Sequence, residues 1–201
     1  MRYFLISSGP DKGIAMRKKV RFNTKRLTIR TLIPVHVAIS YVRGLNDPEI
    51  NRYLVNVRLR KQSLKSVKEF VRMNLVSPTD LLLGLFTKYE NVLIGTIRVS
   101  NISRFHLLCS IGICIFDKSR WGNGYGGEAL IGTVKYIFEK IHLHYIEAGV
   151  YADNKASLRL FRKAGFRVDA HLKNKYRHAD SFREVVLFGI ENPDWKRKRL
   201  R

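Results

Sequence analysis

The sequence SRWGNGYGGEALIGTVKYIFEKI, residues 119–141, places four glycines within six positions directly before a long amphipathic segment. Apolar residues of that segment recur with the 3.6-residue period of an α-helix, at Leu130, Val134, Ile137, Phe138 and Ile141. The first turn of a helix has unpaired N–H groups and a partial positive charge, and glycines let a ligand approach those groups closely. The pattern therefore predicts an anion-binding loop, with a pyrophosphate as the expected ligand.

Two common types of phosphate-binding loop fit this sequence poorly. A Walker loop ends in Gly-Lys-Ser/Thr, whereas Glu128 and Ala129 follow the glycines here. A dinucleotide-binding loop follows the first strand of a repeated strand–helix pattern, whereas this loop follows several predicted strands. From the glycines alone, a flexible surface turn is an equal alternative.

Patterns in the rest of the chain predict a mixture of strands and helices. Alternation and apolar runs predict strands at residues 25–32, 81–87, 92–99, 107–116, 145–151 and 185–190. Amphipathic spacing and capping residues predict helices at residues 34–43, 48–54, 66–74, 125–141 and 153–164, and a polar loop is predicted at residues 173–181. Gly112 interrupts an apolar strand, which often marks a bulge or a close backbone approach. The order predicts a mixed α/β (α+β) fold, with helices on the faces of a central sheet.

The chain is strongly basic, with 38 Lys and Arg against 16 Asp and Glu and a net charge of +22. Such an excess favours an anionic partner: a nucleic acid, a membrane surface or a phosphate-bearing ligand. Part of the charge lies in runs near the two ends, which are often solvated tails. Base-stacking and groove-reading motifs are missing, so nucleic acid is not expected as the main partner. No apolar run is long enough to predict a membrane span.

The two cysteines, Cys109 and Cys114, both fall in one apolar run. Side chains five residues apart on a strand point to opposite faces, so a disulfide between them is not expected. No further cysteine could complete a zinc site. We therefore expect buried, reduced thiols, no bound metal and a cytoplasmic location.

The glycine loop resembles the acyl-CoA motif of the GNAT acetyltransferase superfamily, Gln/Arg-x-x-Gly-x-Gly/Ala. Residues 121–126 read WGNGYG, in which Trp121 departs from the general pattern. With its tryptophan, the stretch instead resembles the loop Trp-Gly-x-Gly-Tyr-x-x-Glu-Ala of the ribosomal-protein alanine N-acetyltransferase subgroup. Glu128 and Ala129 match the last two residues of that loop.

A second stretch resembles another signature of the superfamily, Asn-x-x-Ser/Ala-x-x-Leu-Tyr/Phe-x-x-x-Gly-Phe. Residues 154–166 read NKASLRLFRKAGF and follow the first motif in the order that the family shows. The resemblance covers roughly residues 25–195. It implies an acetyltransferase domain over that range, a basic N-terminal extension at 1–24 and a basic tail at 196–201.

The resemblance implies a mixed sheet of about six to seven strands with helices on both faces. Its fourth and fifth strands, residues 107–116 and 145–151, would splay around acetyl-CoA, which is a cosubstrate. The backbone of the first of these strands would pair with the pantetheine arm, and the glycine loop would hold the pyrophosphate. Contacts with the cosubstrate are implied for Ile115, Phe116, Asp117, Gly122, Asn123, Gly124, Tyr125, Gly126, Gly127, Asn154 and Phe161.

The resemblance also implies direct attack of a primary amine on the thioester, without a metal. Many family members protonate the leaving thiolate with a tyrosine, at the place where this chain has Phe161. Ser157 lies one turn earlier on the same helix face and is the expected substitute, with Asn154 as a nearby donor. The base remains open among four carboxylates, of which Glu184 is the named candidate: Asp117, Glu128, Glu147 and Glu184.

The acceptor stays open between a protein N-terminus and a small amine such as an amino-sugar nucleotide. The enzyme is expected to act as a monomer or a homodimer. The alternative is a non-catalytic module of the same fold that binds acyl-CoA or nucleic acid.

Overall fold

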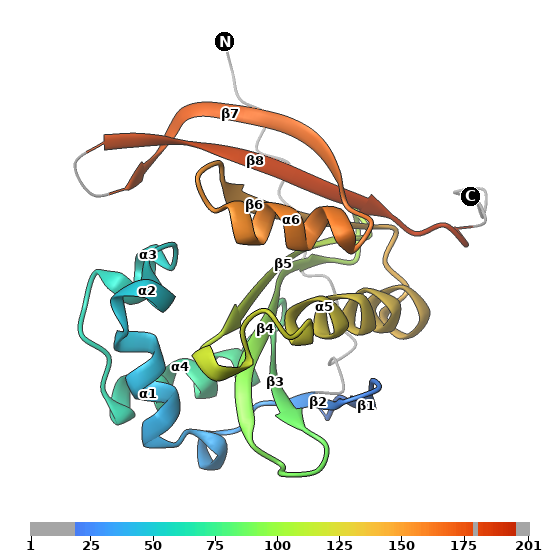
Figure 1. The fold of residues 1–201 in the computed structure, drawn as a ribbon. Coiled ribbons are helices and arrows are strands. Elements are labelled where there is room, and N and C mark those ends of the chain that lie inside the picture. Colours follow the sequence, from blue (N-terminus) through green and yellow to red (C-terminus); the bar gives the residue numbers. More distant parts are fainter. Residues whose placement is uncertain (1–18, 179–180, 196–201) are drawn as a thin grey trace.

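A sheet of eight strands runs through the computed structural model, which describes residues 19–178 and 181–195 (Figure 1). Neighbouring strands follow the order β1-β2-β3-β4-β5-β6-β8-β7. All pairs are antiparallel except β5 and β6, which are parallel. The strands are β1 (Arg21–Asn23), β2 (Leu27–Thr31), β3 (Leu81–Thr87), β4 (Leu93–Ser103), β5 (Leu108–Ile115), β6 (Tyr145–Tyr151), β7 (Arg167–His178) and β8 (Ser181–Glu191). The mixed sheet confirms the predicted fold class.

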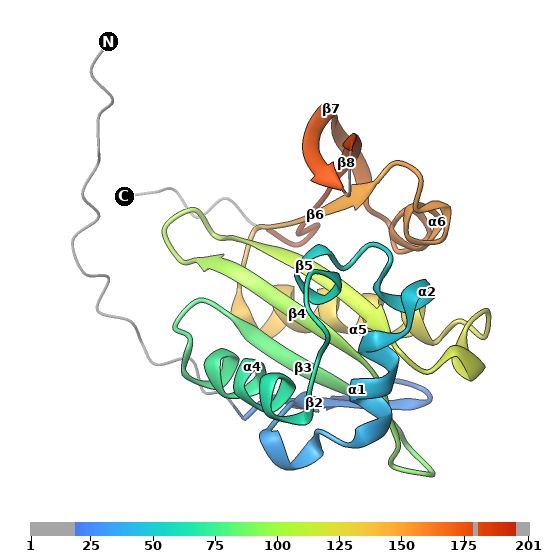
Figure 2. The same cartoon turned by 90° about the vertical axis from the view of Figure 1, so that its left-hand side faces the viewer.

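Helices cover both faces of the sheet, with α1, α2 and α4 on one side and α5 on the other (Figure 2). The core is accordingly divided into two apolar clusters, one beneath α5 and α6 and one beneath α1 and α4. The helices are α1 (Ile39–Asn46), α2 (Pro48–Asn51), α3 (Val55–Arg58), α4 (Leu64–Val76), α5 (Tyr125–Tyr136) and α6 (Lys155–Lys163), with 3₁₀ turns at Pro34–His36 and Lys118–Arg120.

Strand β3 shows how the sequence supplies both clusters. All seven of its residues, LLLGLFT, are buried, as expected for a central strand with both faces covered. Leu83 and Leu85 belong to the cluster beneath α5, whereas Leu82 and Phe86 belong to the cluster beneath α1 and α4. The strict alternation of strand side chains produces this division.

The helix after the glycine loop follows its predicted apolar pattern. Its five periodic residues are all buried, and they are Leu130, Val134, Ile137, Phe138 and Ile141. The α-helix ends at Tyr136 and continues as a π-helical turn over Ile137–Ile141. The wider turn brings the adjacent residues Ile137 and Phe138 toward the same core, and His142 then ends the helix with a φ of 59°.

The N-terminal helices differ from the prediction. The predicted helix at 34–43 is divided into a 3₁₀ turn and α1, because Val37 and Ala38 adopt extended backbone conformations. Helix α4 begins at Leu64, two residues earlier than the predicted start at residue 66. Ser63 is the N-cap, and its Oγ accepts a hydrogen bond from the amide of Ser66 at 3.1 Å. In return, the Oγ of Ser66 accepts a hydrogen bond from the amide of Ser63 at 2.9 Å.

The C-terminal part of the chain also differs. Within the predicted polar loop, residues 173–178 belong instead to β7 and residue 181 begins β8, and the two strands pair as a long hairpin. The sequence did not reveal β7, because its exposed polar residues break the alternation on which the prediction depended. The sheet also extends beyond the predicted start at residue 25, since β1 pairs with β2 and Val20 is buried. Residues 1–18 and the tail at 196–201 lie outside the described residues.

Cys109 and Cys114 are free thiols that pack against the two opposite clusters, which confirms their predicted orientation. Burial raises the pKa of each thiol to about 12, so both stay protonated at neutral pH. In the part of the chain that the structure describes, no helix has the length and apolar character to cross a membrane. No three metal-ligating side chains converge there either.

Candidate active site

Strands β5 and β6 separate after a short paired region. Only three residue pairs join them, from Leu108 opposite Tyr145 to Ser110 opposite Glu147. β5 continues to Ile115 with β4 as its partner, whereas β6 continues with β8. The two inner edges therefore diverge and leave unpaired backbone groups on both sides of a cleft.

The glycine loop lies between the end of β5 and α5. Gly122 and Gly124 have left-handed backbone conformations, with φ of 76° and 79°, which disfavour residues that carry a Cβ. Gly124 is the N-cap of α5, and its carbonyl accepts the amide of Glu128 at 3.1 Å. Within the described chain, the amides of residues 122–127 donate to no acceptor. They form a cradle of free N–H groups at the positive end of a helix dipole, which fits a pyrophosphate.

Glu128 fixes one side of this loop. Its Oε1 accepts hydrogen bonds from Thr24 Oγ1 and the amide of Arg26, both at 2.6 Å, and its Oε2 accepts from Arg26 Nε at 2.7 Å. The same guanidinium donates to the carbonyl of Asn123 at 2.9 Å and lies 4.2 Å from the centroid of the Tyr125 ring. Partial burial disfavours the charged form, but these donors outweigh it and lower the pKa of Glu128. Glu128 is thus an anchor between α5 and β2, and its geometry argues against a role as base.

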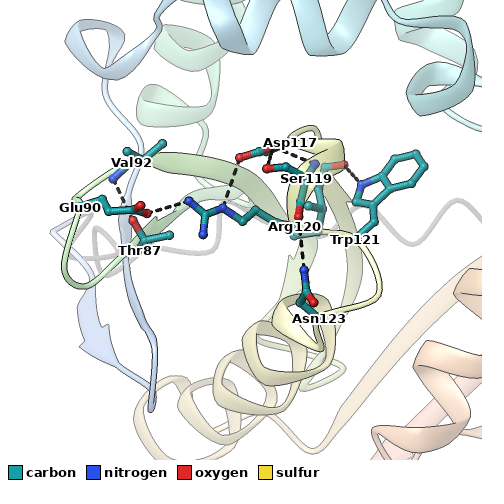
Figure 3. A network of polar contacts seen from close by, with 9 residues as sticks. Thr87, Glu90, Val92, Asp117, Ser119, Arg120, Trp121 and Asn123 are labelled. Atoms are coloured by element: carbon teal, nitrogen blue, oxygen red, sulfur yellow. Dashed lines mark hydrogen bonds and ion pairs between the residues drawn. The ribbon is translucent and has the colours of Figure 1, made fainter.

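A second polar network fixes the other side of the loop (Figure 3). Arg120 lies 2.7 Å from Glu90 Oε2 in the β3–β4 turn and 3.5 Å from Asp117 Oδ2. Asp117 is committed to this network, so it too is unsuited to be the base. The Trp121 side chain is 39% exposed, and its indole N–H donates to the carbonyl of Ile115 at 2.8 Å. The loop is therefore held rigidly from both sides.

The orientation of the β5 backbone differs from the one that the predicted contacts with the pantetheine arm require. Phe116 and Asp117 both donate their amides to the carbonyl of Ile94, at 3.1 and 3.2 Å. These N–H groups face β4 and not the cleft. Antiparallel alternation directs the backbone groups of Ile113 and Ile115 away from β4. The free edge of β5 is thus formed by Ile113 and the Ile115 amide.

A pocket of about 400 Å³ lies where the two strands diverge, between the sheet and helices α1, α3 and α4. Gly112 on β5 lines it, and a Cβ at this position would meet no atom within 4 Å. This glycine leaves open space, so the predicted bulge or close approach at Gly112 is wrong. Most of the wall is apolar or aromatic and comprises Tyr41, Leu45, Leu54, Val57, Val67, Phe70, Leu82, Ile111, Ile113 and Val150.

Helix α6 contributes three of the predicted site residues to this pocket. Asn154 is the N-cap, and its Oδ1 accepts the amide of Ser157 at 3.1 Å. The hydroxyl of Ser157 makes no hydrogen bond within the described chain. Phe161 is buried against Phe166 and Phe188, with ring centroids 5.0 and 5.8 Å away. The structure brings Asn154, Ser157 and Phe161 together, and their chemical roles stay predictions.

Tyr151 also lines the pocket and was missed in the sequence. It is the last residue of β6, and its ring centroid lies 6.0 Å from that of Tyr53. Burial, followed by the nearby Tyr176 and Asp153, raises the pKa of Tyr151, so its hydroxyl keeps its proton at neutral pH. In the sequence, the indication that Tyr151 could belong to the site was its position at the end of a predicted strand that borders the cleft.

No carboxylate lines the pocket in the described part of the chain. Glu184 lies elsewhere, beyond the end of β6, where its carbonyl accepts the amide of Ala152 at 3.0 Å. Its carboxylate is 2.6 Å from His171 Nδ1 and lines a separate groove outside the cleft pocket. This placement disfavours Glu184 as the base, and its role stays a prediction. Glu147 accepts a hydrogen bond from Ser110 Oγ at 2.9 Å, where β5 and β6 are still paired.

The family model described as "Acetyltransferase (GNAT) domain" matches residues 26–167. A probable N-acetyltransferase of Bacillus subtilis, YjcK, is 33% identical over 111 residues, which are 55% of this chain and 61% of that protein. The [Ribosomal protein uS5]-alanine N-acetyltransferase of Escherichia coli is 33% identical over 114 residues, 56% of this chain and 58% of that protein. The chain thus matches about three fifths of the length of these relatives.

A solved structure has the same arrangement of strands and helices. The spermidine N-acetyltransferase of Vibrio cholerae, in complex with CoA and spermine, superimposes with a TM-score of 0.73 at 19% identity. The alignment covers 83% of this chain and 96% of that one. At this identity the likeness concerns the fold.

Proposed function

Because the chain belongs to the GNAT acetyltransferase family, we propose that it transfers the acetyl group of acetyl-CoA to the N-terminal α-amine of a protein. The proposed acceptor has a small, uncharged first residue. The observation that carries this proposal is the compact cleft pocket, in which the described chain places no carboxylate. The relative that acts on an alanine of ribosomal protein uS5 supports the same class of acceptor.

The proposed position of acetyl-CoA follows from two sets of free backbone groups. The diphosphate would accept hydrogen bonds from the amides of residues 122–127, and the pantetheine arm would pair with Ile113 and Ile115 as an added strand. The thioester would then enter the pocket beside Ser157 and Tyr151. The fit of these groups to the cosubstrate supports the proposal.

The electrostatics of the pocket disfavour a polyamine acceptor. A polyamine carries several charged ammonium groups, and burying them without counter-charges is costly. The pocket instead presents apolar walls, and its polar groups are neutral amides and hydroxyls apart from Arg98. The spermidine enzyme of similar fold is therefore a poor guide to the acceptor.

An amino-sugar nucleotide is also disfavoured, because its phosphates require free cations. Arg98 is the single cation that lines the pocket within the described chain. Its Nε donates to Asn74 Oδ1 at 3.2 Å and its Nη2 lies 3.4 Å from Asp80 Oδ2. The guanidinium is thus already paired with a carboxylate.

The absence of a carboxylate among the described pocket residues also favours an α-amine, because an α-amine loses its proton more readily than a side-chain amine does. An N-terminal amine has a pKa of about 7.7–8.0, whereas an aliphatic side-chain amine such as lysine has a pKa of about 10.4. A useful fraction of α-amine is therefore neutral at physiological pH, and water in the cleft suffices to take up the proton. The neutral nitrogen would attack the thioester carbon, and β5 amides would stabilise the oxyanion. As the C–S bond breaks, the new amide nitrogen would lose a proton to water, and the thiolate would take a proton from a pocket hydroxyl, which regains one from water.

A panel of acceptors tests this proposal through release of the CoA thiol. We expect kcat/KM for a short peptide that begins with alanine to exceed that for spermidine by at least about 100-fold. The value should rise with pH and level off above about 8, as the free α-amine loses its proton. The same peptide with a blocked N-terminus and an internal lysine is the control and should not react. Preference for spermidine or an amino-sugar nucleotide would refute the proposed acceptor.

Ser157→Ala tests the source of the proton for the thiolate. We expect kcat to fall by about 100-fold with an unchanged Kd for acetyl-CoA, because a general acid contributes at least that factor. Adding Phe161→Tyr to this variant should restore part of the rate, because it places a phenol on the same helix face. Tyr151→Phe is the comparison. If only that variant is slow, Tyr151 and not Ser157 supplies the proton.

A further inference from the structure

A second concave site lies between α6 and the β7–β8 hairpin, which rises above the helix in Figure 1. This α6–β8 groove has a volume of about 460 Å³. None of its lining residues lines the cleft pocket. Leu158 and Val186 lie nearly buried at its base, with 6% and 2% of their surface exposed, and Glu184 and His171 come from the hairpin. The proposed acetyl transfer leaves this groove without a role.

Three cations of α6 line the groove: Lys155, Arg159 and Arg162. Residues spaced by four and then three positions fall on one face of a helix, so these side chains form a row. At 1.5 Å per residue, the row extends for about 10 Å. A single phosphate is too small to contact cations over that length, whereas successive phosphates of a chain can do so.

These cations have no carboxylate partner within the described residues. The ammonium of Lys155 donates to the carbonyl of Ala152 at 3.1 Å, and the guanidinium of Arg162 lies 6.0 Å from the Phe188 ring. Among the described residues, Glu184 is the one carboxylate that lines the groove, and it is 2.6 Å from His171 Nδ1. The positive charge of the row is therefore available to a ligand.

We propose that the α6–β8 groove binds the sugar–phosphate backbone of a single-stranded nucleic acid, for which RNA serves as the probe. Arginine recognises phosphate oxygens with two parallel hydrogen bonds, and two of the three cations in the row are arginines. A net charge of +22 raises the rate of encounter with a polyanion. This site acts independently of acetyl transfer.

Fluorescence anisotropy with a labelled RNA of about ten nucleotides tests the proposal on the full chain. We expect Arg159→Ala with Arg162→Ala to weaken binding at least tenfold at low salt. The slope of log K against log salt should decrease by about 1.4, because each lost phosphate contact on a single strand contributes about 0.7. Lys65→Ala with Lys140→Ala is the matched control, since both lysines are exposed and lie outside the groove. The control should bind within twofold of the wild type.

A second measurement uses the wild-type protein and does not depend on the folding of a variant. RNA should protect Lys155 from an amine-reactive reagent and leave Lys65 reactive. Equal losses in the two double variants, or no protection of Lys155, would overturn the proposal. Displacement of the RNA by CoA would assign the cations to the cosubstrate, and tighter binding of an oligoglutamate than of RNA would assign them to an acidic peptide. Either result would also overturn it.

Discussion

Gly124→Val is expected to raise the Kd for acetyl-CoA by at least about 100-fold, a loss of about 2.7 kcal/mol. Gly124 has a φ of 79°, and a β-branched residue is strongly disfavoured in this conformation. The loop would relax to another conformation, and the free amides of residues 122–127 would no longer point to one centre. Isothermal titration calorimetry with CoA measures the effect, and thermal unfolding checks that the variant is folded.

Gly126→Ala is the matched control for this experiment. A Cβ at Gly126 would lie 3.6 Å from Leu160 Cδ1, an ordinary packing distance directed into the protein. We therefore expect CoA affinity within about threefold of the wild type, a difference of under about 1 kcal/mol. If Gly124→Val retained its affinity while folded, the amide cradle would not be the diphosphate site. If both variants failed equally, the left-handed conformation at Gly124 would not be the cause.

Gly112→Leu is expected to lower kcat/KM for the peptide acceptor by at least about 100-fold, while the Kd for CoA stays within about threefold. A Cβ at this position meets no atom within 4 Å, so the new side chain would extend into the pocket of about 400 Å³ without displacing the core. It would occupy the space proposed for the first residue of the acceptor. Steady-state kinetics together with CoA titration separates this loss from a loss of cosubstrate.

Gly149→Ala provides the matching control on the other strand of the cleft. Gly149 also lines the pocket, but its Cβ would contact Val185 and Leu187 of β8 at 3.5 and 3.8 Å. We expect nearly wild-type kinetics from this variant. Undiminished activity of Gly112→Leu with the peptide would show that the acceptor binds elsewhere, and equal damage by both substitutions would indicate distortion of the sheet.

The elements that the sequence predicted well are those whose signal is local. The period of apolar residues after the glycine loop identifies the buried face of α5, and Asn154 with Gly165 marks the two ends of α6. Strand β6 has the predicted bounds of 145–151. In each case the signal lies within one helix or strand, in side-chain spacing or in a residue with special backbone geometry.

The features that the sequence missed or left open depend instead on distant segments. Glu184 was a candidate base by residue type, and the pairing of β6 with β8 places its carboxylate in another groove beside His171. Glu128 was ambiguous until Thr24 and Arg26, about a hundred positions earlier, were seen to supply its hydrogen bonds. Hairpin β7–β8 was missed because pairing with a neighbour, and not an apolar pattern, makes β7 a strand.

The sequence by itself determined the fold class and the glycine-lined helix start, since helix periodicity and the backbone freedom of glycine are properties of short segments. The tertiary structure alone decided which polar groups face the cleft. That choice depends on where β5 and β6 stop pairing, on the alternation of hydrogen bonds between β4 and β5, and on how α1, α3 and α4 close over the gap. These are contacts between distant segments, and no local pattern encodes them.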